Sequence, residues 1–323
     1  MQCHSCGHEW RVDAEWLERF DQGKETCQSC GTDCHGEDRP DFWALDDAAL
    51  GEGARVRELY WYHSSTHANW PNLDLDPTAT LTEVTKRRFE TLGTDGHALD
   101  RWAAREKTRA IHLGTYEAAI ENMLRRMSDQ DGSGSQYYLY RVRLSAQAVV
   151  DPGVHPEPTD FVGNVQLEDV APGVDVLRYV NTHEDPSSIS LAVSHRSIGS
   201  VQGIPIPPLV DQTTPWVRAA TTRLREAASR PPRQPQTQLE RMRRRMPSAV
   251  SEELRELERE VASTLPLGLR DRFSVGSNED DNTSVDPAAL AAKLAGLAQL
   301  VLDPSAIFSA LDDEPCRTVS TPP

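Results

Sequence analysis

The beginning of the chain contains two pairs of cysteines, and in each pair two residues separate the cysteines and a glycine follows. The pairs are Cys3 with Cys6 and Cys27 with Cys30. Each pair forms a tight turn that presents two thiolates to one ion, and the glycine lets the backbone bend there. Two such turns about twenty residues apart are typical of a zinc ribbon. Because four thiolates fill a tetrahedral coordination sphere, the spacing predicts a structural Zn²⁺ site within residues 1–38.

The remaining donors near these pairs are interpreted as bystanders, and Cys316 falls in the expected tail. These donors are His4, His8, Cys34 and His35. The chain shows no apolar run long enough for a bilayer and no basic-then-apolar leader, so the expected compartment is the cytoplasm. In that reducing setting, clustered cysteines bind metals more often than they form disulfides.

Charge bears on what the predicted ribbon contacts. Residues 1–50 hold 4 Lys and Arg against 12 Asp and Glu, and the whole chain has a net charge of −16. An acidic module repels phosphates. The ribbon is therefore interpreted as a folding clip or a protein-docking element, although a local patch that contacts nucleic acid stays open as an alternative.

Changes in composition divide the 323 residues into several units. After Pro208 the pattern changes from strand-like to helix-like. Residues 214–260 hold 11 Arg against 7 Glu, most densely at Arg241–Arg245; a solvated helix face or a dock for the acidic N-terminal half is favoured over nucleic-acid contact. The expected organisation is a zinc ribbon at 1–38, an acidic linker at 39–54, a strand-rich domain at 55–211, a helical region at 212–310 and a flexible tail at 311–323.

The segment from Thr108 to Met127 has the pattern of a strand, a turn and a helix. Residues 110–113 suit a short buried strand, Gly114 breaks it, and Thr115 can cap a helix whose apolar residues recur on one face. His112 is therefore expected at the end of a strand, facing a turn.

Two other segments carry polar residues in comparable positions. Residues 58–65 are interpreted as an aromatic-rich strand that delivers His63, followed by Ser64 and Ser65. Residues 176–190 predict a strand, then Glu184, then a second short strand near Ser188. We therefore expect His63, His112 and Glu184 to converge.

The same three segments resemble the ADP-ribosyltransferases, in the branch of diphtheria toxin and the poly(ADP-ribose) polymerases. The matching segments are Tyr62-His-Ser-Ser65, Ile111-His-Leu-Gly-Thr115 and Tyr179-Val-Asn-Thr-His-Glu184-Asp-Pro-Ser-Ser-Ile-Ser190, and the resemblance covers residues 55–208. Ser64 stands where that family usually has glycine, and His112 where it usually has tyrosine. The resemblance implies an α+β domain of mostly antiparallel sheets split around an NAD cleft.

The resemblance also implies roles for individual residues. Glu184 would bind the nicotinamide-ribose hydroxyl and stabilise the positive charge that builds on the ribose as nicotinamide leaves. His63 would bond the adenosine-side ribose, and His112 would lie against the nicotinamide ring. The implied catalytic set is Glu184, His63 and His112, and the implied NAD-binding set is His63, Ser64, His112, Tyr62 and Thr115. Tyr62, next to His63 on the strand, should point to the opposite face.

The implied activity is mono-ADP-ribosyl transfer from NAD to a macromolecule inside the cell, with protein favoured as the acceptor. Thr182, two residues before Glu184, argues against arginine as the modified side chain. Two alternatives stay open: a zinc-ribbon binding module whose degenerate fold no longer turns over NAD, and transfer to nucleic acid. The sequence does not specify an oligomeric state.

Overall fold

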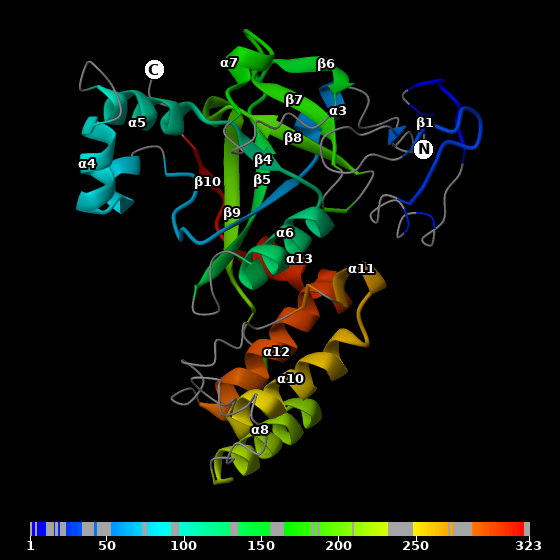
Figure 1. The fold of residues 1–323 in the computed structure, drawn as a ribbon, viewed down its shortest axis with the longest axis vertical. Helices are drawn as coiled ribbons and strands as arrows, with labels where there is room; N and C mark the ends of the chain where they lie inside the picture. Colours follow the sequence, from blue (N-terminus) through cyan, green and yellow to red (C-terminus); the bar gives the residue numbers. More distant parts are fainter. Residues whose placement is uncertain are drawn as a thin grey trace.

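The first of two four-stranded sheets is antiparallel and has the order β10-β9-β5-β3 (Figure 1). Its strands are β3 (Trp61–Ser65), β5 (Tyr137–Leu144), β9 (Ile198–Ile206) and β10 (Arg317–Thr318). In this computed structural model, the described residues are 2–3, 5–10, 16, 19, 24–33, 42–43, 53–72, 76–91, 97–129, 135–155, 165–181, 184–185, 188–208, 210–231, 248–270, 272–273 and 286–319.

The second sheet has the order β4-β8-β7-β6 and contains one parallel pair, β6 with β7. Its strands are β4 (Ile111–Leu113), β6 (Val150–His155), β7 (Val176–Val180) and β8 (Ile189–Val193). The described part of the chain is thus α+β, as the sequence predicted at this coarser level, and it contains two four-stranded sheets.

The two sheets meet along their edge strands β3 and β4. Tyr62 donates its N–H to the carbonyl of Gly114 (2.9 Å), and Gly114 donates back to Tyr62 (3.0 Å). Among the described residues, this is the one β-bridge between the facing edges, so the sheets separate on either side of it. Side chains from both β3 and β4 can therefore point into the space beside this bridge.

Helix α6 (Tyr116–Asp129) follows β4 and has the cap that the sequence predicts. Thr115 Oγ1 accepts a hydrogen bond from the Ala118 N–H (3.1 Å), which satisfies one of the unpaired amides of the first turn. The apolar side of α6 is buried through residues such as Ile120 and Met123, in one cluster with the C-terminal helices. Helix α6 therefore lies between the sheets and the helical region (Figure 1).

The C-terminal helices form a bundle on the far side of α6. They are α8 (Pro215–Ala228), α10 (Ala249–Ala262), α11 (Leu267–Arg270), α12 (Pro287–Leu302) and α13 (Pro304–Asp313). The sequence Asp286-Pro-Ala-Ala-Leu predicts a capped helix start, and Asp286 does cap α12 by accepting from the Ala288 N–H (3.1 Å). The bundle buries Leu254, Leu257 and Leu294.

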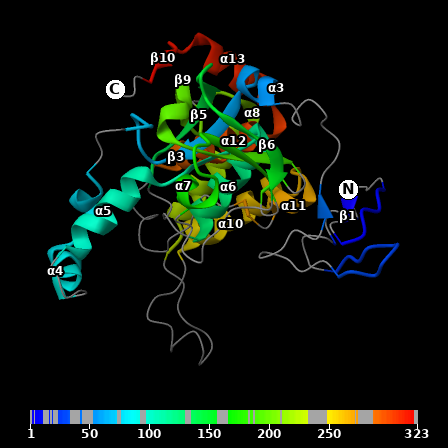
Figure 2. The ribbon, with the colours of Figure 1, turned by 90° about the horizontal axis from the view of Figure 1, so that it is seen from above.

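The remaining elements are short or peripheral. Helices α4 and α5 extend away from the sheets, on the side opposite the N-terminal strand β1 in both views (Figures 1 and 2). These elements are β1 (Gln2–Cys3), β2 (Phe42–Trp43), α3 (Gly53–Glu58), η1 (Pro77–Thr80), α4 (Glu83–Thr91), α5 (Ala98–Thr108), α7 (Leu167–Val170) and η2 (His195–Ser197).

Several expected boundaries differ from the structure. Residues 53–58 are helical, so β3 begins at Trp61 rather than near Glu58. The prolines from Pro152 to Pro158 predict a loop, but β6 includes Pro152 and continues to His155. Helix α5 was not expected, since its pattern has no buried side to predict it from.

The units expected at the two ends also differ. In the expected linker, residues 42–43 pair with β1. The expected flexible tail begins inside α13, and Arg317–Thr318 pairs with β9, so residues 311–319 belong to the folded body.

Within the described residues, no single helix has the length and apolar character needed to cross a membrane. Only α12 and α13 taken together meet that test, and they are bent by 98° where they join.

Candidate functional site

A cavity of about 90 Å³ opens where the two sheets separate. We call it the cleft. Strand β3 contributes His63 and Ser64, strand β4 contributes His112, and Glu184 comes from the segment that links β7 to β8. Three segments that are far apart in sequence therefore meet at one place, as the sequence predicted. The complete lining is Tyr62, His63, Ser64, His112, Leu113, Gly114, Ala118, Ala119, Asn122, Tyr179, Asn181, Glu184 and Ser190.

His63 is held by a stack and a hydrogen bond. Its ring lies 4.2 Å from the Trp70 ring at 19°, and its Nδ1 is 2.9 Å from the His112 carbonyl oxygen. Because a carbonyl only accepts, Nδ1 carries the proton and Nε2 is left as an acceptor. Burial lowers the pKa of His63 to about 4, so the ring is neutral near pH 7.

His112 is also neutral near pH 7. Burial, with a smaller contribution from the charge of Arg109, lowers its pKa to about 4, against the opposing effect of Glu184. Its Nδ1 is 2.9 Å from the Tyr179 hydroxyl, and the two rings meet edge to face. The Tyr179 contact fixes the plane of the ring at the cleft wall.

Glu184 has one carboxylate oxygen engaged and one available. Asn122 Nδ2 (3.0 Å) and Arg125 Nη2 (2.8 Å) donate to Oε1, and Arg125 Nε adds a longer bond (3.2 Å). Its backbone N–H donates to Asn181 Oδ1 (2.8 Å). Within the described part of the chain, no donor contacts Oε2. Glu184 is 9% exposed, so this oxygen is an acceptor in a largely desolvated place.

The turn after Glu184 has an unusual backbone conformation. Asp185 has φ of 48°, a left-handed conformation that costs free energy for a residue with a side chain. Two contacts from α6 and its cap hold it there: its N–H donates to Glu121 Oε2 (2.7 Å), and Thr115 Oγ1 donates to its carboxylate (2.7 Å). Glu121 is in turn ion-paired with Arg272, from the helical region.

The other residues assigned from the sequence have different positions. Ser64 is buried and lines the cleft. Tyr62 lines it too, but its ring packs edge to face on Tyr116 and beside Phe308, so it points to the opposite side of the strand as predicted. Thr115 does not line the cleft; it caps α6 and holds Asp185.

Sequence reasoning missed the residues that position Glu184. Asn122 and Arg125 lie on α6, one helical turn apart, and Asn181 bonds Ser190 Oγ through Nδ2 (2.9 Å) while it accepts from Glu184. The polar positions at 122 and 125 share the side of α6 that faces the turn, and this was the available signal. Thr182, which bore on the acceptor, and Arg241–Arg245 lie outside the described residues.

The two cysteine pairs form matching turns. In the first, Gly7 has φ of 71° and its N–H donates to the Cys3 carbonyl (2.8 Å); in the second, Gly31 has φ of 70° and donates to the Cys27 carbonyl (2.8 Å). Left-handed φ values are what glycine supplies at low cost. The glycines therefore have the role that the sequence predicted.

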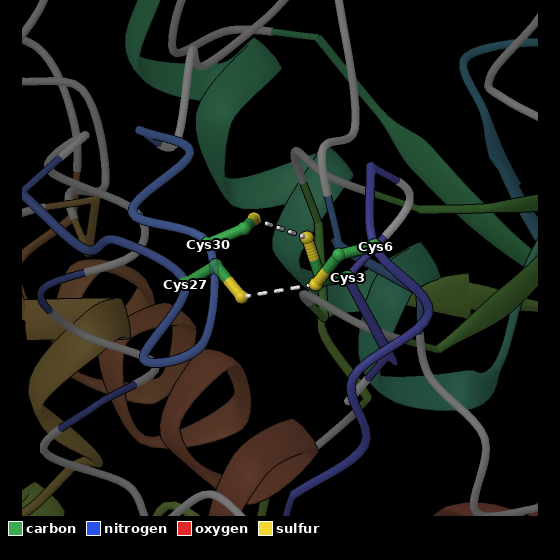
Figure 3. Close-up of side chains that lie close together, drawn as sticks. All are labelled: Cys3, Cys6, Cys27 and Cys30. Carbon is green, nitrogen blue, oxygen red and sulfur yellow. Dashed lines mark hydrogen bonds between the residues drawn. The ribbon is translucent and has the colours of Figure 1, made fainter.

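The four sulfur atoms gather at one point (Figure 3). Cys3 Sγ is 3.7 Å from Cys30 Sγ, Cys6 Sγ is 3.7 Å from Cys27 Sγ, and all four lie within 4.8 Å of one another. Zn–S bonds of about 2.3 Å in a tetrahedron place sulfurs about 3.8 Å apart. This cluster, which we call the four-cysteine centre, can hold a metal ion. The expected bystanders His4, Cys34 and His35 lie outside the described residues, and His8 stacks on Trp10.

Comparison of the chain with protein-family models, with curated proteins and with solved structures gives no match in any of the three.

Proposed function

We propose that the chain transfers single ADP-ribose units from NAD to a macromolecular acceptor, with protein favoured, and releases nicotinamide. The observation that carries the proposal is the meeting of His63, His112 and Glu184 in one cleft between two split sheets. These are the three positions that resemble the NAD site of ADP-ribosyltransferases. The two sheets support an ADP-ribosyltransferase-like domain.

The proposed chemistry uses the free oxygen of Glu184. In the reaction the bond between ribose C1′ and the nicotinamide nitrogen breaks, and its electron pair leaves with nicotinamide. The acceptor nucleophile then bonds to C1′ and loses a proton. A fixed carboxylate beside the ribose stabilises the positive charge of this transition state more than the ground state. Asn122 and Arg125 orient Oε1, and Oε2 remains to accept a ribose hydroxyl.

The two neutral histidines fit complementary roles. His112 offers a flat uncharged ring at the cleft wall, which suits contact with nicotinamide. His63 offers Nε2 as an acceptor for a hydroxyl of the second ribose. A cavity of about 90 Å³ suits a single ring, so the remainder of NAD would extend toward solvent. The four-cysteine centre, with four thiolates and no open position, fits a structural Zn²⁺ ion.

Nicotinamide release from NAD by the full chain tests the proposal, with and without cell extract as a source of acceptors. Glu184→Gln should lower the rate about a hundredfold or more, because it removes the charge and keeps the shape. Glu117→Gln is the matched control, since Glu117 is an exposed glutamate on α6. Both variants are checked for equal folding and metal content. Equal release by wild type and Glu184→Gln, or none by either, would contradict the proposal.

One contact favours a second candidate, a module that binds NAD without turning it over. Arg125 pairs with Glu184 at 2.8 Å, which offsets the negative charge that the transition state needs. Saturable NAD binding by the wild type without nicotinamide release in any extract would favour this candidate. Arg125→Ala would then leave release undetectable, whereas an active enzyme would change its rate.

A further inference from the structure

A second cavity, of about 250 Å³, lies on the first sheet, and none of its lining residues lines the cleft. We call it the arginine pocket. Arg141 is in register with Tyr62, whose ring packs beside Phe308 of α13, so this is the side of the sheet that faces the helices. The pocket is bounded mainly by Tyr60, Arg141, Arg143, Ser200, Gln202 and Asp312.

Arg141 is a fixed part of the pocket. Its side chain is 6% exposed, and it donates to Gln202 Oε1 (2.8 Å) and to Asp312 Oδ1 (2.6 Å). Gln202 is itself held, because its Nε2 donates to the carbonyls of Leu311 (2.9 Å) and Glu314 (2.8 Å). The buried guanidinium is therefore oriented before any ligand arrives, which lowers the entropy cost of binding.

Arg143 has a different environment. It is exposed, and no carboxylate of the described residues forms an ion pair with it. Its Cζ lies 4.4 Å from the centre of the Tyr60 ring, and Arg141 Cζ lies 4.5 Å from the same point. Tyr60 itself is 42% exposed. The ring holds the Arg143 guanidinium in place and keeps its N–H groups available.

The charge of the arginine pocket is opposite to that of the chain. Two guanidinium groups face one carboxylate there, while the whole protein has a net charge of −16. A general negative field repels anions, so anion binding needs a local set of donors such as this one. Ser200, whose side chain is a neutral hydroxyl, also lines the pocket.

We propose that the arginine pocket binds a small phosphate ester. A guanidinium makes paired, charge-assisted hydrogen bonds to phosphate oxygens, and a dianionic phosphate can use both arginines. The volume of about 250 Å³ is below the 300–1,000 Å³ typical of drug-sized ligands, which favours a small ester such as one with a single ring.

Calorimetric titration of the full chain with phenyl phosphate tests the proposal, with benzoate and phenol as companion probes. Phenyl phosphate should bind saturably, benzoate more weakly because it carries one charge, and phenol not at all. Arg143→Ala should weaken phenyl phosphate binding about tenfold or more, as expected for loss of a hydrogen bond to a charged group. Arg143→Lys should retain part of the affinity.

Two controls locate the binding. Arg218→Ala removes an exposed arginine of α8 and should leave the affinity unchanged. Glu184→Gln should also leave it unchanged, which separates the arginine pocket from the cleft and makes this test independent of the proposed NAD reaction. No saturable binding to wild type, or equal affinity in Arg143→Ala and wild type, would overturn the proposal. Tighter binding of benzoate than of phenyl phosphate would overturn the choice of phosphate.

Discussion

The four-cysteine centre and the cleft are both built from polar side chains, but they gather those side chains in different ways. The four thiols come from two short turns, each closed by its own backbone hydrogen bonds. The cleft takes His63, His112 and Glu184 from three separate segments, and the packing of two sheets and α6 brings them together.

The two sites therefore depend on different stabilising interactions. Among the described residues of the N-terminal segment, Trp16 is the largest buried apolar side chain, and Cys3 and Cys27 are also buried. Four thiols cannot stay clustered without an ion to balance them once they ionise. The cleft rests instead on two buried apolar clusters and on hydrogen bonds between fixed elements. We expect the ribbon to depend on metal and the cleft to depend on tertiary contacts.

Metal removal should give the largest effect. If the four-cysteine centre holds Zn²⁺ as proposed, a strong chelator removes a binding free energy on the order of 10 kcal/mol, so residues 24–33 should lose amide-exchange protection. The amides of β5 and β8 should keep theirs, because neither strand contacts the four-cysteine centre. Exchange measured by NMR or mass spectrometry tests both statements. If residues 24–33 keep their amide-exchange protection after verified metal loss, the order of this segment does not depend on metal.

Removing the ion pair between Arg272 of the helical region and Glu121 of α6 should give a smaller loss of stability than metal removal. Arg272→Ala removes the partner of Glu121, which is buried and also holds the Asp185 N–H. Loss of one member of a largely buried pair costs about 3 kcal/mol. We expect faster amide exchange at Asp185, lower stability in urea and, if the proposed function is correct, slower nicotinamide release.

Arg259→Ala is the control for this prediction, because Arg259 forms an exposed pair with Glu256 that should contribute little. Exchange at Asp185 can be read whether or not the protein turns over NAD. Unchanged exchange there in Arg272→Ala would show that the helical region does not support the turn after Glu184.

Acidification should lower the stability of the cleft gradually, because its effect is spread over more than one pH unit. His63 and His112 each have a pKa of about 4 in the folded chain against 6.5 ordinarily, so the unfolded chain takes up protons first as the pH falls. Their contribution to stability is complete above pH 6.5 and is lost between pH 6.5 and about 4, at up to about 1.4 kcal/mol per pH unit for each ring.

Urea unfolding near pH 7 and near pH 5 measures this slope. His63→Gln should reduce the slope by the share of one ring, and His97→Gln, at an exposed position, should not. A slope that is the same in all three proteins would show that His63 is not held neutral by its surroundings.

The sequence could predict the features that are local. The spacing of the cysteines, the glycine after each pair and the Thr115 cap are encoded within a few residues, and the structure has all of them. The strands that carry His63 and His112 were predictable as well, because aromatic or apolar residues flank each histidine, and Glu184 was expected between two strands. The resemblance to ADP-ribosyltransferases stays a prediction.

The support of the cleft could not be predicted, because it depends on distances in three dimensions. Nothing near Glu184 in the sequence shows that Asn122 and Arg125 will reach it from α6, or that Arg272 will fix Glu121. Strand β6 was not predicted because it contains Pro152, which usually interrupts a strand. Strand β10 was not predicted because residues 315–319 lack an apolar alternation.

Gly114 determines how wide the cleft can be. It forms the bridge to Tyr62, and a Cβ atom added there would lie 2.9 Å from the Ala118 Cβ and 3.2 Å from Ser190 Oγ. Any side chain at this position would therefore drive the start of α6 away from β8, which would widen the gap in which Glu184 and His112 face each other. The width of the cleft therefore depends on Gly114, the residue without a side chain that bridges the two sheets.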